Sequence, residues 1–141
     1  MKKIITKSEE ETIEIGAKIA AKLKVGDIIC MKGDLGAGKT TLTKSIAKNL
    51  GINDYVTSPT FTIINEYNGK YPLYHFDVYR IENPEDMYEL GFEEYFYGKG
   101  ICIIEWANMI EELIPEESIW IELDYGSNEN ERVIIINGID I

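Results

Sequence analysis

The sequence predicts an α/β fold with three layers, in which helices cover both faces of a mixed, mostly parallel sheet that also carries antiparallel hairpins. Three observations support this prediction. Residues 27–31 and 101–104 are short apolar runs without polar alternation, which is typical of strands covered on both faces. Apolar residues recur at helical spacing in two other segments. Finally, two segments of strand composition flank Asn68-Gly69, a turn signal for a hairpin.

The first expected element is a helix that begins after Ser8. Ser8 and Glu11 fit a capping box, in which the serine hydroxyl accepts the amide of Glu11 and the glutamate carboxylate reaches back. The apolar face of this helix comprises Ile15, Ile19 and Leu23. A buried strand at 27–31 follows, and a second helix runs from Lys39 to a stop at Gly51.

The remaining elements alternate between strands and short helices. Segments 61–67 and 73–79 have strand composition and are expected to pair as an antiparallel hairpin. A short helix is expected to open at Asn83-Pro84 and to end at Gly91. The later elements are a strand at 101–104, a helix-like stretch that stops at Pro115, and two closing strands at 119–123 and 132–136.

Composition narrows the class of protein and of partner. The chain has 141 residues, 28% of them charged and 45% hydrophobic, which is ordinary for one globular domain, here residues 1–141. Its net charge of −11 opposes unassisted binding to nucleic acid or to an anionic membrane. The two cysteines lie inside apolar runs, and no apolar run approaches the ~20 residues of a membrane span. A cytoplasmic location is therefore expected.

Residues 33–40 match the phosphate-binding pattern G-x-x-x-x-G-K-[ST], between an expected strand and an expected helix. Glycines let successive backbone N–H groups converge on phosphate oxygens, and the helix start adds positive potential in the same direction. Lys39 would supply a full charge to the β and γ phosphates, and the Thr40 hydroxyl can bind Mg²⁺. The pattern predicts a P-loop nucleoside triphosphatase type of fold and a nucleotide site.

Two acidic residues are candidates for the carboxylate that such a site needs beside its metal. Glu105 follows the fully apolar run 101–104, as expected at the end of a central strand. Asp77 lies in a segment with polar alternation, which predicts a half-exposed strand. The fully apolar strand before Glu105 favours this residue as the metal ligand. Asp77, in the strand with polar alternation, is then expected to position water or to neighbour the ligands of the metal. A surface acid without such a role remains the alternative for each.

Three further features have both a functional and a plain structural interpretation. Residues 57–60 (Thr-Ser-Pro-Thr) could form a switch loop that senses the γ phosphate, or a simple turn. His75, the only histidine, has no cysteine or histidine nearby in the sequence, and we expect a structural role. Trp106 directly after Glu105 either packs in the core or caps the site.

Four blocks of sequence together are more specific than the phosphate-binding pattern alone. They comprise residues 33–41, 58–62 with 65–67, 75–80, and 104–106. In order and spacing the sequence resembles the TsaE family, bacterial P-loop ATPases required for threonylcarbamoyladenosine formation in tRNA. The likeness covers about residues 8 to 125. It departs from the more usual Leu-Asp-Leu pattern at Phe76-Asp77-Val78, which is a packing change.

The resemblance implies ATP and Mg²⁺ as cofactors and assigns roles to individual residues. Thr40 and Glu105 would bind the metal, and catalysis would involve Lys39, Asp77 and Glu105. The residues implied to contact ATP are Gly36, Ala37, Gly38, Lys39, Thr40, Thr41 and Thr60. The segment around residues 7–11 would lie near the adenine. The family also implies two partner proteins of TsaB and TsaD type, which carry the transferase chemistry and hold the tRNA, so that tRNA is met only indirectly.

Competing functions are weighed against the same residues. A small-molecule kinase of P-loop type usually clamps the transferred phosphoryl group with arginines from a lid, but the chain has only Arg80 and Arg132. A module that binds nucleotide without hydrolysis is weakly opposed by the intact Lys39, Thr40, Asp77 and Glu105. A GTPase is disfavoured because no Asn-Lys-x-Asp sequence occurs. A slowly hydrolysing Mg-dependent ATPase that switches a partner complex remains the favoured interpretation.

Overall fold

The computed structural model describes residues 1–33, 36–53, 56 and 64–141. Its strands are β1 (Lys2–Thr6), β2 (Ile28–Gly33), β3 (Ile64–Asn68), β4 (Pro72–Asp77), β5 (Ile101–Glu105), β6 (Ile119–Tyr125) and β7 (Arg132–Asn137). Its helices are α1 (Glu9–Ala20), α2 (Lys39–Asn49), α3 (Asp86–Glu89) and α4 (Phe92–Phe96), with a 3-10 helix η1 (Ala107–Leu113).

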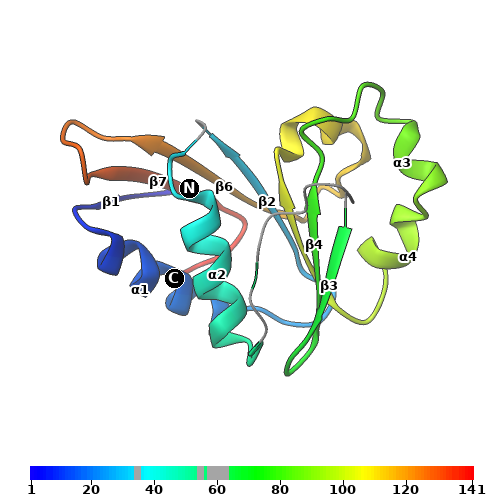
Figure 1. Ribbon diagram of the computed structural model, residues 1–141, viewed down its shortest axis with the longest axis horizontal. Coiled ribbons are helices and arrows are strands. Elements are labelled where there is room, and N and C mark those ends of the chain that lie inside the picture. Colours follow the sequence, from blue (N-terminus) through cyan, green and yellow to red (C-terminus); the bar gives the residue numbers. More distant parts are fainter. Residues whose placement is uncertain (34–35, 54–55, 57–63) are drawn as a thin grey trace.

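These strands form a seven-stranded mixed sheet in the order β1-β7-β6-β2-β5-β4-β3 (Figure 1). The pairs β6-β2, β2-β5 and β5-β4 are parallel, whereas β1-β7, β7-β6 and β4-β3 are antiparallel. The predicted α/β class with a mixed sheet and antiparallel hairpins is thus confirmed. Parallel pairing is confined to the four central strands, whose carboxyl ends therefore lie at one edge of the sheet.

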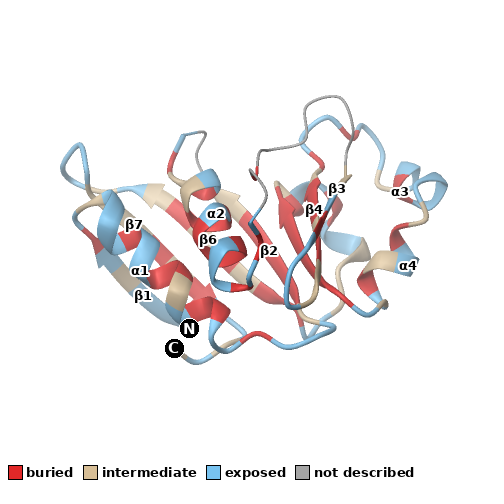
Figure 2. Cartoon of the chain, turned by 60° about the horizontal axis from the view of Figure 1, so that its bottom comes forward, coloured by how far each residue is buried: buried red, intermediate tan, exposed pale blue. Residues whose placement is uncertain are grey.

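Helices cover both faces of the central sheet, and alternate residues of β2 show this directly. Ile29 and Met31 belong to the core beneath α1 and α2. Ile28 and Cys30 belong to a second core beneath α3, α4 and η1. Figure 2 shows the buried residues running along these central strands. The apolar runs at 27–31 and 101–104 are therefore strands covered on both sides, as predicted.

Helices α1 and α2 pack closely against each other, and both begin near the same edge of the sheet. The predicted serine cap is present at the start of α1, where Ser8 Oγ accepts the Glu11 amide at 3.2 Å. Glu11 reaches back as predicted, but its Oε1 accepts the amide of Lys7 at 3.0 Å, one residue before the Ser8 amide of a standard capping box. Further along, Ser45 of α2 donates its hydroxyl to the Ile13 carbonyl of α1 at 2.6 Å. The two helices thus form one rigid layer.

Several expected boundaries differ from the structure, each for a local physical reason. Strand β1 was not among the expected elements; it exists by pairing with β7 far along the chain. Gly91 ends α3 as expected, but its left-handed conformation (φ 69°) starts α4 rather than a loop. The stretch before Pro115 is a 3-10 helix, interrupted at Ile110 (φ −128°), rather than an α-helix.

The hairpin between α2 and α3 is present, but only part of its first strand is described. Strand β3 starts at Ile64 in the structure, and residues 61–63 of the expected strand lie outside the described residues. Strand β4 ends at Asp77 rather than at residue 79. It lies between β3 and β5, and its residues largely alternate between partly exposed and buried, so the half-exposed strand predicted from its polar alternation is present.

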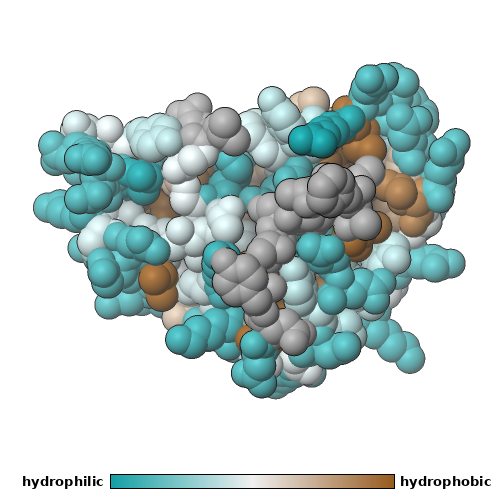
Figure 3. All heavy atoms as spheres, viewed as in Figure 1, coloured by the Kyte–Doolittle hydropathy of each residue, from teal (hydrophilic) through white to brown (hydrophobic). Residues whose placement is uncertain are grey.

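The face of the molecule drawn in Figure 3 is largely hydrophilic, in keeping with the charge of the chain. Figure 3 shows hydrophilic side chains over the side of α1, β1 and β7, with apolar side chains gathered on the side of α3 and α4. Within the described ranges, the structure contains no helix with the length and apolar character of a membrane span.

Candidate functional site

The loop between β2 and α2 turns the chain sharply at the carboxyl edge of the sheet. Gly38 caps α2 in a left-handed conformation (φ 104°) that side chains rarely permit, and it offers no side chain to the first helical amides. A Cβ atom on Gly33 would overlap the carbonyl oxygen of Leu123 on β6. At Gly33 and Gly38 the chain thus presents backbone without a side chain, and the positive end of α2 begins directly after Gly38. Asp34 and Leu35 lie outside the described residues.

Lys39, the first residue of α2, is almost completely buried. Its Nζ atom donates a hydrogen bond to the Gly33 carbonyl at 3.0 Å and lies 4.4 Å from the centre of the Trp106 ring. The same ring contacts Tyr79, with ring centres 4.7 Å apart. The Trp106 side chain, which is only partly buried, thus lies over the lysine of the loop, as the capping alternative for this residue requires.

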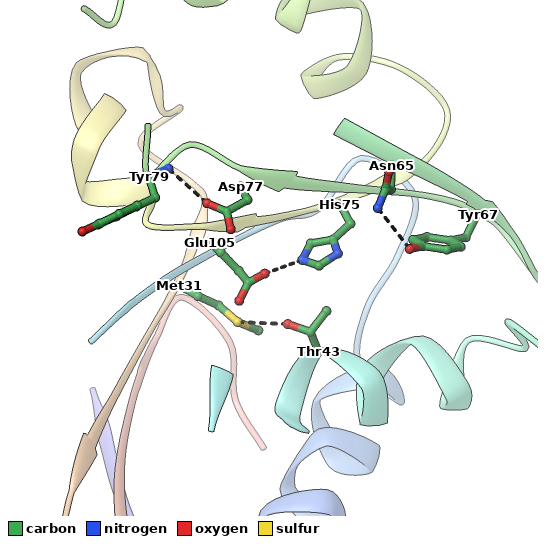
Figure 4. Close-up of polar contacts among 8 residues, drawn as sticks. All are labelled: Met31, Thr43, Asn65, Tyr67, His75, Asp77, Tyr79 and Glu105. Atoms are coloured by element: carbon green, nitrogen blue, oxygen red, sulfur yellow. Dashed lines mark hydrogen bonds and ion pairs between the residues drawn. The ribbon is translucent and has the colours of Figure 1, made fainter. Parts of the chain in front are cut away.

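The two candidate carboxylates lie side by side. Asp77 and Glu105 are register partners at the ends of the parallel strands β4 and β5, and Met31 of β2 is the partner of Glu105 on its other side. Paired residues of parallel strands point to the same face, here the face covered by α2. Figure 4 shows both carboxylates on this face, above Met31 and Thr43. Thr43 donates its hydroxyl to the Met31 sulfur at 3.5 Å, which ties α2 to the sheet.

A cavity of about 260 Å³ brings these groups together. Its lining residues are Gly36, Gly38, Lys39, Thr40, Thr41, Asp77, Glu105 and Trp106. Of the other residues implied to contact nucleotide, Ala37 is buried beneath the loop and Thr60 lies outside the described residues, as does the whole proposed switch segment 57–60.

The two carboxylates have different surroundings. Burial raises the pKa of the Asp77 carboxyl above its ordinary value; the Tyr79 amide, which donates to Asp77 Oδ1 at 3.0 Å, opposes this shift, and nearby Glu105 reinforces it. Glu105 is only 3% exposed, and its Oε2 lies 2.6 Å from His75 Nε2 (Figure 4). Asp77 is thus partly exposed, whereas Glu105 is buried and held by His75.

The donor set of this cavity suits a hard divalent cation. Thr40 contributes a hydroxyl, and Asp77 and Glu105 contribute carboxylates, all on one lining. Mg²⁺ prefers oxygen ligands, and in nucleotide sites it is usually held by one or two carboxylates together with waters and phosphate oxygens. The residues present therefore fit Mg²⁺ bound with a phosphorylated ligand.

A second cavity, of about 150 Å³, opens on the other side of the loop. It shares Gly36, Gly38 and Thr41 with the first cavity, and its other lining residues are Ser8, Glu9, Thr12, Asn130 and Arg132. The guanidinium of Arg132 is held over the Tyr125 ring at 4.7 Å and donates to the carbonyls of Glu129 and Glu131. Ser8 and Glu9 come from the segment that the family resemblance places near adenine.

Sequence reasoning assigned no site role to Asn130 or Arg132. Arg132 reaches the cavity because β7 pairs with β1, where Arg132 is the register partner of Thr6. No local pattern around residue 132 signals this pairing. The hydrogen bond between His75 and Glu105 was likewise not predicted, although the spacing of His75 and Asp77 places both on one face of a strand.

Comparisons with known proteins agree with this fold. The chain matches the family model described as threonylcarbamoyl adenosine biosynthesis protein TsaE over residues 6–134. It is 49% identical over 129 residues to the tRNA threonylcarbamoyladenosine biosynthesis protein TsaE of Bacillus subtilis (strain 168), covering 91% of this chain and 80% of that protein. The protein of the same name from Nostoc sp. (strain PCC 7120) is 40% identical over 140 residues, covering 96% and 85%.

A solved structure shows the same architecture. The crystal structure of Bacillus subtilis YdiB superposes with a TM-score of 0.78 at 46% sequence identity, covering 94% of this chain and 82% of that one. Family model, relatives and fold thus point to one group of proteins, and the resemblance found in the sequence is confirmed. The chain belongs to the TsaE family of tRNA threonylcarbamoyladenosine biosynthesis proteins.

Proposed function

We propose that this chain is a Mg-dependent ATPase subunit of the assembly that forms threonylcarbamoyladenosine in tRNA. It binds ATP, hydrolyses it slowly when isolated, and acts as a switch on partner transferase proteins of TsaB and TsaD type. One observation carries the proposal: Lys39, Thr40, Asp77 and Glu105 line a single cavity beside a phosphate-binding loop. These are the cationic, hydroxyl and carboxylate groups that binding and hydrolysis of Mg-ATP require.

The two cavities suggest the direction in which ATP lies. Both contain Gly36, Gly38 and Thr41, so a triphosphate on the loop has space on either side of these residues. Thr40, Asp77 and Glu105 line only the larger cavity, and this supports a terminal phosphate and its metal on that side. The adenosine then extends toward Ser8 and Glu9 in the smaller cavity.

Each residue of the larger cavity has a distinct task. Lys39 exchanges its bond to the Gly33 carbonyl for a phosphate oxygen when nucleotide binds. Thr40 and Glu105 hold Mg²⁺, which neutralises charge on the phosphates when bound. Asp77, beside Glu105 and nearer the opening, orients the attacking water. Thr60, in the segment that is not described, stays a predicted contact to nucleotide.

Slow turnover by the isolated chain follows from the positions of its two arginines. Arg132 lines the smaller cavity and is held by backbone carbonyls, and Arg80 is exposed. Neither lines the cavity that contains Glu105. An arginine that neutralises the transferring phosphoryl group can be worth about 10³–10⁵ in rate. A partner protein that supplies or reorganises such a group would therefore accelerate hydrolysis.

The charge of the chain supports an indirect relation to tRNA. With a net charge of −11, the protein repels a polyanion except where positive potential is concentrated, as at the loop before α2. The loop accommodates a triphosphate rather than an RNA helix. We therefore assign tRNA binding to the partner proteins and ATP turnover to this subunit.

Steady-state ATP hydrolysis, measured alone and with the two partner proteins, tests this proposal. We expect slow turnover alone and faster turnover in the complete mixture, together with tRNA modification that stops after few rounds when only this chain is omitted. Glu105→Ala should weaken the Mg²⁺ dependence of binding more than Asp77→Ala does. Rapid turnover by the isolated chain, or modification that continues unchanged without it, would contradict the proposal.

A further inference from the structure

His75 is the least expected member of the site, because it is a titratable side chain that is almost completely buried in the sheet. It is 1% exposed, and its one hydrogen bond in the described part of the chain joins Nε2 to Glu105 Oε2 at 2.6 Å. Its other ring nitrogen, Nδ1, is buried without a hydrogen-bond partner there. Burying an unsatisfied polar atom opposes folding.

The sheet register explains why the imidazole reaches this carboxylate. His75 lies two residues before Asp77 on β4 and is the register partner of Ile103, two residues before Glu105 on β5. All of these residues point to the face that α2 covers. The ring therefore lies diagonally below Glu105, and Figure 4 shows it directed at the Glu105 carboxylate.

The direction of the hydrogen bond follows from the chemistry of the two groups. A glutamate that binds Mg²⁺ does so as a carboxylate, which only accepts hydrogen bonds, so in that role Glu105 requires His75 Nε2 to carry the hydrogen and to donate it to Oε2. The terminal torsion of a glutamate side chain is intrinsically broad, and it selects no single orientation of the carboxylate. The bond from His75 supplies a fixed contact for one oxygen and thereby restricts this rotation.

We propose that His75 is a positioning residue that orients the Glu105 carboxylate for Mg²⁺. The inference rests on the proposed function, in which Glu105 holds the metal. Hydrogen-bonding partners of metal ligands typically change metal affinity or activity by about 10–100-fold when removed. A histidine that only filled the core would gain nothing from a buried Nδ1 without a partner, since an apolar side chain of similar size fills the same space without that penalty.

The test compares three proteins: wild type, His75→Phe and His75→Gln. Phenylalanine keeps the approximate volume but removes the donor, whereas the terminal amide of glutamine can still donate near the position of Nε2. The probe is AMPPNP, whose binding is measured by calorimetry over a series of Mg²⁺ concentrations, with thermal unfolding recorded in parallel. Mg-free AMPPNP binding serves as the internal control for the shape of the site.

We expect His75→Phe to raise the Mg²⁺ concentration at half-saturation about 10–100-fold. His75→Gln should restore most of this loss, while Mg-free binding and the unfolding temperature of both variants stay near those of wild type. An unchanged Mg²⁺ requirement in His75→Phe would overturn the inference. So would equal losses of Mg-free and Mg-dependent binding, because a structural role predicts that pattern.

Two additions keep the outcomes distinct. If His75→Phe does not fold, His75→Asn replaces it: its amide is too short to donate at the position of Nε2, so it should lose the Mg²⁺ response that His75→Gln retains. Glu105→Ala separates this inference from the proposed function. If Glu105→Ala has the same Mg²⁺ concentration at half-saturation as wild type, the role of Glu105 itself is refuted. If this concentration rises in Glu105→Ala but not in His75→Phe, only the role of His75 is refuted.

Discussion

Gly16 lies where α1 packs against α2, and its replacement by alanine tests how firmly this layer supports the site. A Cβ atom on Gly16 would lie 2.5 Å from Ser45 Cβ and would also overlap Ser45 Oγ. Ser45 is held in place, because its hydroxyl donates to the Ile13 carbonyl at 2.6 Å. The added methyl group must therefore displace α1 from α2 or break this hydrogen bond.

Opposing contributions set the size of the effect. Alanine in place of glycine favours a helix interior by about 1 kcal/mol. Overpacking of a close contact typically costs about 1–3 kcal/mol, and loss of the hydrogen bond from Ser45 adds about 1 kcal/mol. Overpacking alone leaves a net loss of about 1 kcal/mol, and loss of the hydrogen bond as well makes it about 2 kcal/mol. We therefore expect Gly16→Ala to lower the free energy of unfolding by about 1–2 kcal/mol and the unfolding temperature by about 3–7 °C.

Urea unfolding followed by circular dichroism measures this change. The matched control adds Gly16→Ala to a Ser45→Gly protein, in which the obstructing side chain is absent. Gly16→Ala should cost less stability in this background than it costs in the wild type. Nucleotide affinity should fall as well, because Ser8 and Thr41, from the first turns of the two helices, line the same cavity. A Gly16→Ala protein as stable as wild type, or more stable by the helix-propensity gain, would refute the close contact.

Three further predictions concern single side chains. Lys39→Ala should abolish Mg-ATP binding in calorimetry, because it removes the full positive charge of the loop; an unchanged affinity would exclude a contact to the triphosphate. Asp77→Asn should slow hydrolysis without lowering the unfolding temperature. Burial raises the pKa of this carboxyl, so its ionised form opposes folding at neutral pH, and the asparagine removes that charge. The amide oxygen of the asparagine can still accept the Tyr79 N–H. A clear loss of stability would contradict this account. Burial also raises the pKa of the Cys102 thiol to about 12, against about 8.5 in an unfolded chain. Between these two pH values the thiol keeps its proton in the folded state but loses it in the unfolded state, which favours unfolding as the pH rises. Wild type should therefore lose stability on going from pH 8 to pH 10 more steeply than Cys102→Ala, by at most about 1.4 kcal/mol per pH unit, as measured by urea unfolding; parallel slopes would show that the thiol is not protected.

The features that the sequence predicts well are those that local chemistry specifies. Residues 28–31 form a strand between two cores because every side chain is apolar, and the glycines after it permit the turn that leads into α2 at Lys39. Glu105 could be placed at the end of a central strand for the same reason. These local patterns suffice to place the phosphate-binding loop and one carboxylate at the same edge of the sheet.

The features that escaped prediction depend on pairing between distant segments. Residues 2–6 carry two lysines and bury only Thr6 completely, so no alternation marks them as a strand; β7 supplies the hydrogen bonds that make them one. The contact between His75 and Glu105 depends on the register of β4 against β5, which neither strand encodes alone. Arg132 reaches the smaller cavity by the same kind of distant pairing.

The pairing of β1 with β7 has a consequence for biosynthesis. The phosphate-binding loop leaves the ribosome early, but β1, the strand that leads into Ser8 and Glu9, has β7 as its neighbour in the sheet. One wall of the smaller cavity can thus be anchored only after residues 132–137 have been translated. A nascent chain that already carries residues 33–40 still lacks one wall of the cavity proposed for the nucleoside, so this cavity is complete only after the final strand of the sheet has been added.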